Sequence, residues 1–312
     1  MITKMDKRKL TAHLLAIVTV TVWATTFIAS KKLLGIFSPL QILFMRFILA
    51  YIALWIIRPR RLRLSKKEEL CFLLMGVFGG TLYFYTENTA LVYTLASNVS
   101  IIVATAPILT ALLAHFCTRD EKLRSSSVWG FFIAITGVVL VVCNGAYVLK
   151  VNPLGDFLSL CAAISWAVYS MLLKRFASKY DSFLVTRRTM LWGILTALPL
   201  ILIEGKPLDL SALKAPTPLF CLLFLGLVGS AACYVFWATA VERLGVVKTN
   251  SYIYLVPFIT IVAAALLLKE PISFAAVLGA GLITAGVVVA QRRPKSEPVQ
   301  DPVPEQEQSS AE

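Results

Sequence analysis

The 312 residues are too apolar for a water-soluble globule, since 58% are hydrophobic and 15% are charged, against about 45–50% and about 25% in soluble domains. A chain of this length cannot hide the excess in one interior, because too much surface remains. The net charge of +13 lies in short basic clusters between apolar segments, which excludes a nucleic-acid partner and indicates a membrane protein.

We expect an all-α integral membrane protein with ten transmembrane helices, because a helix needs about 20 mostly apolar residues to cross about 30 Å of hydrocarbon. The basic N-terminus, residues 1–10, lacks a small-residue cleavage site, so the first apolar segment reads as a retained helix rather than a signal peptide. In chain order, the predicted spans are 11–32, 38–57, 68–91, 97–117, 127–147, 154–174, 183–203, 217–240, 247–268 and 272–291.

The placement of Lys and Arg predicts the orientation of these helices. One side collects most of them, in the N-terminus and in the segments 58–67, 119–124, 174–179, 243–248 and 292–295. Because cytoplasmic loops carry the excess of Lys and Arg, we expect both termini in the cytoplasm. Without a predicted cleaved signal or a long outer domain, the plasma (inner) membrane is the expected location of this multi-pass protein. The tail 292–312 is rich in Pro, Gln, Glu and Ser, which predicts a disordered cytoplasmic segment.

The chain contains an internal repeat. WATTFIASKKL from Trp23 is echoed by WAVYSMLLKRF from Trp166, and the segment around Pro107 by the segment around Pro257. Farther on, the segment from Glu121 matches the segment from Glu270, and Gly130 and Gly137 fall on Gly279 and Gly286. We therefore predict a first repeat at 11–147 and a second at 148–291.

Each repeat holds five spans, an odd number, so the two halves must enter the membrane with opposite polarity. Inverted repeats place a solute site near the membrane midplane and alternate its access by rocking one half against the other. The alternative is an old duplication that serves stability alone.

Aromatic and amide side chains are the candidates for solute binding, because facing rings and amides can bind a zwitterion or an aromatic cation. A belt of interfacial aromatics with amides that cap helix ends is the alternative interpretation. The candidate substrate-binding residues, taken with one acidic residue, are Trp23, Tyr85, Glu87, Asn88, Asn98, Trp166, Trp237, Asn250 and Tyr252.

Arg46 and Glu87 are charged residues well inside predicted spans, where charge is costly. Arg46 lies about 12 Å below the outer end of the second span at 1.5 Å per residue, and Glu87 lies in the outer third of the third span. The two could meet as an ion pair, and either a structural link between helices or a solute-binding or proton-coupling role fits them. Pro107 and Pro257 each remove one helical hydrogen bond, which indicates kinks that either gate the cavity or improve packing.

No catalytic or cofactor motif is found in the sequence. The Gly-rich stretches lie inside apolar segments rather than in phosphate-binding loops, and the six cysteines are scattered singly without His partners. We therefore expect no enzyme activity, no cofactor and no metal site.

Several motifs in order resemble those of the drug/metabolite transporter superfamily, most closely its EamA-type family. They are the segment at Trp23, the Arg in the second span, ALVYTLASN from Ala90, GDFLSLCAAISWA from Gly155, and Glu270-Pro271. The resemblance implies ten helices, two EamA repeats and a central pathway often used to export amino acids or other metabolites. Val92 and Val241 depart from the family pattern, and the second repeat lacks an acidic residue at the position matching Glu87.

The sequence therefore predicts a secondary transporter, an exporter of a small organic solute such as an amino acid, working by alternating access. An integral membrane enzyme or a translocator acting on a lipid or polyprenyl-linked substrate is the alternative. The expected partners are the solute and membrane lipid, with proton coupling or facilitated diffusion both open, in a monomer or a homodimer.

Overall fold

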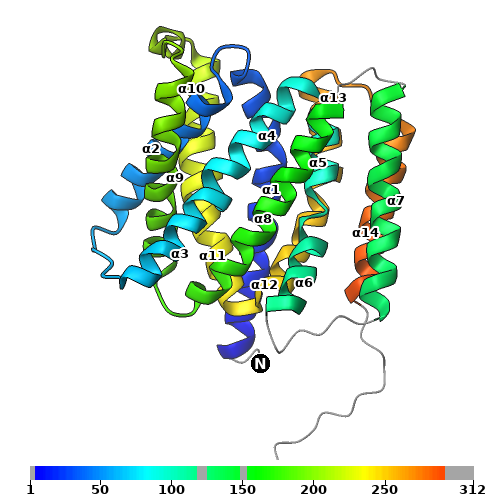
Figure 1. The fold of residues 1–312 in the computed structure, drawn as a ribbon, viewed down its shortest axis with the longest axis horizontal. Coiled ribbons are helices and arrows are strands. Elements are labelled where there is room, and N and C mark those ends of the chain that lie inside the picture. Colours follow the sequence, from blue (N-terminus) through cyan, green and yellow to red (C-terminus); the bar gives the residue numbers. More distant parts are fainter. Residues whose placement is uncertain (1–3, 118–124, 148–152, 292–312) are drawn as a thin grey trace, which may run out of the picture.

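The computed structural model describes residues 4–117, 125–147 and 153–291, and within these ranges all regular secondary structure is helical (Figure 1). The predicted disordered tail, residues 292–312, lies outside them, as do the basic residues at 119–124. We call the end of the bundle where α1 begins the near end, and the opposite end the far end.

The helices follow one another as the apolar segments predict. The first repeat consists of α1 (Lys4–Leu33), α2 (Pro39–Ile57), α3 (Lys66–Gly76), a π-helical segment (Val77–Thr81), α4 (Leu82–Tyr93), α5 (Ala96–Val103), α6 (Ala106–Cys117) and α7 (Ser125–Tyr147). The second consists of α8 (Pro153–Ala177), α9 (Ser182–Glu204), a 3₁₀ turn (Leu210–Lys214), α10 (Pro216–Leu223), a π-helical segment (Phe224–Ala232), α11 (Cys233–Leu244), α12 (Val246–Asn250), a 3₁₀ turn (Ser251–Leu255), α13 (Val256–Leu268) and α14 (Phe274–Gln291).

Eight helical stretches among the described residues are long and apolar enough to cross a membrane, and two shorter apolar stretches lie in α7 and α14. Together they confirm the expected all-α membrane architecture. The exposed side chains on the outside of the bundle include Ile56, Ile203 and Phe274, each more than half exposed, as expected of residues that face lipid.

Local sequence signals set where the helices begin and end. Ser38 starts α2 with a capping box. Its side-chain oxygen accepts from the backbone N–H of Gln41, and the Gln41 side-chain oxygen accepts from the backbone N–H of Ser38. Gly245 separates the end of α11 from the start of α12. Its φ of 84° is a backbone conformation that residues with a Cβ rarely adopt.

The same irregularities occur in both repeats. The third and eighth spans contain the π-helical segments, and the fourth and ninth spans are broken. Pro107 is the second residue of α6 and Pro257 the second residue of α13, so each proline lies in the first turn after a break rather than in a continuous helix. Discontinuous helices in corresponding positions of two repeats are typical of transporter solute sites.

The last helices of the two repeats, α7 and α14, pack side by side at one edge of the bundle (Figure 1). A methyl group on Gly137 would lie 2.8 Å from the carbonyl oxygen of Gly279, and one on Gly286 would lie 2.5 Å from that of Gly130. The two backbones approach this closely because glycine has no side chain.

Replacing Gly279 with leucine should destabilise this helix pair by about 1–3 kcal/mol through overpacking. A Cβ there would lie 2.3 Å from a methyl of Val141 and 3.0 Å from the Gly137 carbonyl oxygen. Gly281→Leu on the same helix is the matched control, because a Cβ at Gly281 meets no atom within 4 Å. The melting temperature in detergent measures both; equal melting of the two variants would contradict the close approach.

Candidate functional site

Aromatic rings from both repeats meet in the middle of the bundle. The ring centroids of Trp23 on α1 and Trp166 on α8 lie 5.0 Å apart at an interplanar angle of 84°. Trp237 on α11 lies 5.0 Å from Trp23 and 6.0 Å from Trp166, and Tyr234 packs against both of the first two. The two repeat-equivalent tryptophans thus form the centre of one cluster.

The indole N–H groups tie this cluster to the irregular helices. The Nε1 of Trp23 donates to the carbonyl oxygen of Gly229 at 2.9 Å, inside the π-helical segment. The Nε1 of Trp166 donates to Oδ1 of Asn250 at 3.1 Å, at the end of α12. The Nε1 of Trp237 is buried without a hydrogen-bond partner in the described structure, which is uncommon for a buried indole.

A guanidinium group lies against the same cluster. Arg46 on α2 is 1% exposed, its Nε donates to Oγ of Ser230 at 2.8 Å, and its Cζ lies 4.1 Å from the centroid of the Phe84 ring. One terminal nitrogen, Nη1, has no hydrogen-bond partner among the described residues. Arg46 therefore keeps a donor that no described residue satisfies.

Glu87 on α4 is the nearby carboxylate. It is 5% exposed, and Tyr83, one turn earlier, donates to its Oε1 at 2.8 Å. The ion pair expected between Arg46 and Glu87 is not among those that the described residues form, although both side chains line one cavity. The two opposite charges face a shared space.

That cavity lies at the junction of α1, α2, α4, α8 and α11. Its volume is about 30 Å³, room for about two water molecules. Sites for drug-sized ligands occupy about 300–1,000 Å³, so the cavity must widen before it could hold an organic solute. Its lining combines rings and charges: Trp23, Thr26, Phe27, Arg46, Tyr83, Phe84, Glu87, Val103, Trp166, Tyr234, Ile253 and Val256.

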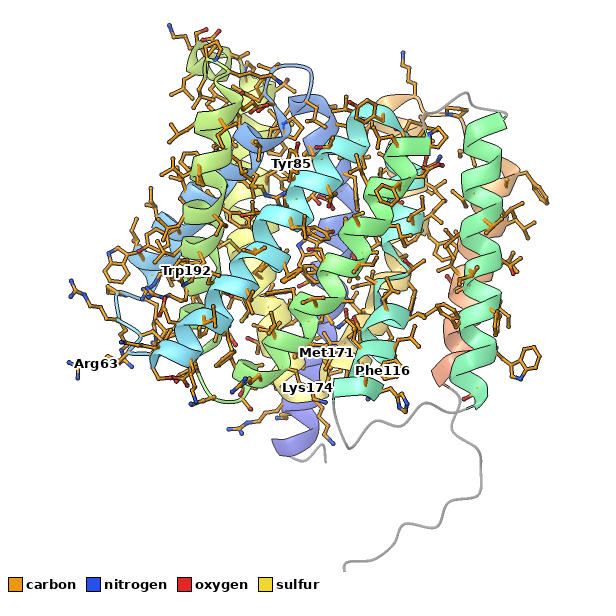
Figure 2. The ribbon with its side chains drawn as sticks, in the orientation of Figure 1. Arg63, Tyr85, Phe116, Met171, Lys174 and Trp192 are labelled. Atoms are coloured by element: carbon orange, nitrogen blue, oxygen red, sulfur yellow. The ribbon has the colours of Figure 1, made fainter. Side chains whose placement is uncertain are left out.

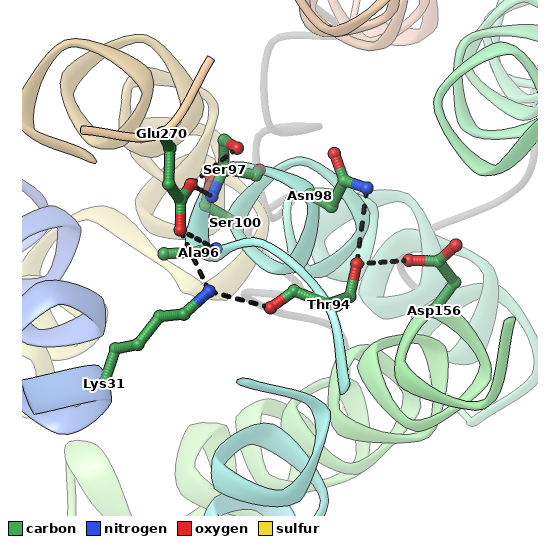
Figure 3. Close-up of polar contacts among 8 residues, drawn as sticks. All are labelled: Lys31, Thr94, Ala96, Ser97, Asn98, Ser100, Asp156 and Glu270. Carbon is green, nitrogen blue, oxygen red and sulfur yellow. Dashed lines mark hydrogen bonds and ion pairs between the residues drawn. The ribbon is translucent and has the colours of Figure 1, made fainter. Parts of the chain in front are cut away.

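The remaining candidate residues lie around this cavity or away from it. Asn250 is buried and orients the Trp166 indole, whereas Asn88 is buried and donates to the carbonyl of Pro39 at 3.4 Å. Asn98 donates to Thr94 at the far end (Figure 3). Tyr85 is 41% exposed on α4 (Figure 2).

The hydroxyl of Tyr252 is hydrogen-bonded to Nδ1 of His13, and neither residue lines the cavity. The structure thus brings Trp23, Trp166, Arg46 and Glu87 together, with Trp237 packed beside them.

A second polar cluster lies at the far end of the bundle, and Figure 3 shows its contacts. Glu270, between α13 and α14, accepts from the backbone N–H groups of Ala96 and Ser97 at 2.9 and 3.2 Å and pairs with Nζ of Lys31 at 3.0 Å. Lys31 also donates to the carbonyl oxygen of Thr94 at 2.9 Å. We call Lys31, Glu270 and the start of α5 the far-end latch, because it joins elements of both repeats.

The contacts of the latch favour the ionised form of Glu270. Burial raises the pKa of its carboxyl, but the backbone N–H of Ala96 and the ammonium group of Lys31 outweigh burial, so the pKa lies below its ordinary value. The carboxylate also lies at the N-terminus of α5, where helical N–H groups favour negative charge.

Sequence reasoning missed several of these residues. Phe84, Ser230 and Tyr234 lie on helices whose apolar composition gives no sign of which side chain faces the centre. For Glu270 a signal was available, because the repeat comparison matches the segments that begin at Glu121 and Glu270. A glutamate therefore recurs at the same position in both halves, shortly after the predicted fourth and ninth spans.

Comparison with known proteins bears on this geometry. The model of the EamA-like transporter family matches twice, at residues 10–143 and 153–291. The chain belongs to the EamA-like transporter family. As an EamA-like protein it is a multi-pass membrane transporter with two EamA domains, and the two matches correspond to the two halves that meet at the tryptophan cluster.

Relatives of this EamA-like chain cover nearly its full length. A transporter of Archaeoglobus fulgidus is 31% identical over 284 residues, 88% of this chain and 95% of that protein. A protein of Streptantibioticus cattleyicolor named "Probable terminal-alkyne amino-acid exporter" is 29% identical, over 89% of this chain and 92% of its own length. A crystal structure with a TM-score of 0.66 and 22% identity covers 90% of this chain and 97% of that one, and shows the fold alone.

Proposed function

We propose that this protein is a secondary transporter that exports a small zwitterionic solute, such as an amino acid or a related metabolite. The observation that carries the proposal is the pair of opposite charges, Arg46 and Glu87, on one aromatic cavity between the repeats. The name of the Streptantibioticus cattleyicolor relative is consistent with an amino-acid solute.

The chemistry of the cavity matches the two ends of an amino acid. A carboxylate can accept from the unpartnered Nη1 of Arg46, a charge-assisted hydrogen bond of the stronger kind. An ammonium group can bind Glu87 and the faces of Trp23 and Trp166, which attract cations. The side chain of the solute then lies among the remaining rings.

Alternating access is the mechanism that we propose for this site. Repeats that are inverted and carry corresponding helix breaks can rock against each other around a central site. With the far-end latch formed and the cavity small, release at the far end requires the latch to open. We propose that both termini are cytoplasmic in the plasma membrane, so that the far end faces outward and release there is export.

Uptake and efflux in proteoliposomes test the proposal with a panel of labelled amino acids, amines and carboxylic acids, each with and without a pH gradient. We expect Glu87→Gln to reduce zwitterion flux by about 30-fold or more, since loss of a charged hydrogen-bond partner costs about 2–5 kcal/mol. Carboxylic acids without an ammonium group should be affected much less. Glu242→Gln, an exposed carboxylate at the end of α11, is the matched control.

The outcomes separate the candidate mechanisms. Flux that follows the pH gradient in the wild type and loses this dependence in Glu87→Gln would assign proton coupling to that carboxylate, and flux indifferent to the gradient indicates facilitated diffusion. An absence of flux across the panel from folded protein would contradict the proposal and favour a lipid or polyprenyl-linked substrate.

A further inference from the structure

A second cavity, separate from the central one, lies at the near end between α2 and α9. Its volume is about 300 Å³, and it shares no lining residue with the central cavity. Three arginines line it, Arg61, Arg187 and Arg188, with Tyr51, Trp55 and three leucines. No carboxylate is among its lining residues.

Acidic residues near the cavity neutralise only part of this charge. Glu69 pairs with Arg188 and also accepts from Nε1 of Trp192 at 2.7 Å. The Nε of Arg188 remains buried without a partner among the described residues. The ion pair with Glu69 therefore holds the Arg188 guanidinium in place while its Nε–H stays available to a ligand.

The other two arginines have no carboxylate partner in the part of the chain that is described. Arg187 is 6% exposed, and its terminal nitrogens donate to the backbone carbonyl oxygens of Arg58, at 2.6 Å, and Arg60. Those bonds hold the 58–65 connection over the cavity and leave the positive charge of Arg187 in place. Arg61, on that connection, is exposed at the mouth of the cavity.

The surface beside the cavity is apolar, as expected of a surface that faces lipid. Ile52, Ile56 and Ile57 on the last turns of α2 are 50%, 73% and 63% exposed. Trp55, between them, is 37% exposed, and the Cζ of Arg187 lies 4.2 Å from its ring centroid. Tryptophan near the end of a span marks the membrane–water interface, the depth at which lipid headgroups lie.

From this arrangement we infer that the cavity binds a phosphate anion, supplied by the headgroup of an anionic phospholipid in the leaflet at the near end. Guanidinium forks match phosphate oxygens in geometry and charge. Basic pockets between transmembrane helices bind acidic headgroups on the cytoplasmic side, and the isoleucines next to the mouth offer contact to the acyl chains. Inorganic phosphate has no acyl chains and would leave that apolar surface without a contact.

Native mass spectrometry and thermal shift of the full chain in detergent test the inference. The probes are dioctanoyl phosphatidylglycerol, dioctanoyl phosphatidylcholine, dioctanoylglycerol and inorganic phosphate. We expect phosphatidylglycerol to bind as a retained adduct and raise the melting temperature, phosphatidylcholine to bind more weakly, and dioctanoylglycerol to do neither.

Two variants with the same change of charge give the decisive comparison. Arg61→Gln should weaken phosphatidylglycerol binding about fivefold, since one basic residue near a lipid headgroup contributes about 1 kcal/mol. Arg63→Gln is the control, because Arg63 belongs to the same connection, does not line the cavity and projects outward at the near end (Figure 2).

Equal weakening in both variants would overturn the site, since it would show attraction to overall charge alone. Displacement of the lipid by inorganic phosphate at matching concentration would overturn the lipid as the source of the anion. Lipid binding and melting temperature are measured without transport. They therefore test the lipid site even if the proposed export function is wrong.

Discussion

Replacing Arg46 with methionine should reduce solute flux by about 100-fold or more and leave the protein at least as stable as the wild type. The flux falls because the solute carboxylate loses its charged donor, and about 2.7 kcal/mol corresponds to a factor of 100. Flux in proteoliposomes and the melting temperature in detergent measure the two quantities on the same preparation.

The expected stability follows from the surroundings of the guanidinium. Arg46 is 1% exposed, has no ion pair among the described residues and leaves Nη1 unsatisfied, so its burial is only partly compensated. Replacing buried charge with an apolar side chain of similar volume is often neutral or stabilising by about 1–4 kcal/mol. A residue retained at such a cost is typical of an intramembrane functional site.

This result distinguishes the two roles that the sequence left open for Arg46. If the residue only links helices, Arg46→Met should lower the melting temperature, and flux should fall only as far as folded protein is lost. Arg175→Met, an exposed arginine at the end of α8, controls for the change of charge and should alter neither quantity.

Glu270→Gln should open the far-end latch. The Glu270 side chain is 6% exposed and that of Lys31 26%, so the substitution leaves a largely buried ammonium group without its counter-ion. Removal of one partner of a buried pair costs about 3–5 kcal/mol. We expect a lower melting temperature and faster amide hydrogen exchange in peptides that span residues 94–100, where the N–H groups of Ala96 and Ser97 lose the carboxylate.

The pH dependence of this effect has a definite sign. Because the folded-state pKa of Glu270 lies below its ordinary value, the latch is fully stabilising above the ordinary carboxyl range. Its contribution is lost as the pH falls through the lowered pKa. The difference in melting temperature between the wild type and Glu270→Gln should therefore be constant near neutral pH and shrink in acid.

A double-mutant cycle with Lys31→Gln tests whether the two residues act together. The double variant should be less destabilised than the sum of the single variants, since each single change already breaks the pair. Additive losses, or exchange in the 94–100 region that stays as slow as in the wild type, would show that Glu270 does not hold the far end shut.

The sequence predicted the all-α membrane architecture and part of the site, for identifiable reasons. Membrane spans are long and apolar, and a repeat is visible wherever marked residues such as Trp23 and Trp166 recur. Those two tryptophans were chosen because they correspond, and contact between corresponding residues is what a twofold arrangement of repeats produces at its centre.

Other features depend on helix rotation and on backbone irregularity, which an apolar sequence does not reveal. Tyr85 and Glu87 are two positions apart on α4, yet the tyrosine is 41% exposed and the glutamate is buried in the cavity lining. The π-helical segments also escaped prediction. Each changes the direction in which the following side chains point around the helix, and no residue type signals that change. Ser230, the hydrogen-bond partner of Arg46, lies on such a segment, so this contact escaped prediction as well.

Each glycine at the contact between α7 and α14 faces a glycine of the other helix that is not its own repeat equivalent. Gly130 corresponds to Gly279 and Gly137 to Gly286 in sequence, while in space Gly137 faces Gly279 and Gly130 faces Gly286. The seam is thus the isologous contact of two equivalent helices that run in opposite directions. A chain with one repeat could form this seam only between two copies inserted in opposite orientations, whereas here both helices belong to one chain and a single insertion places them.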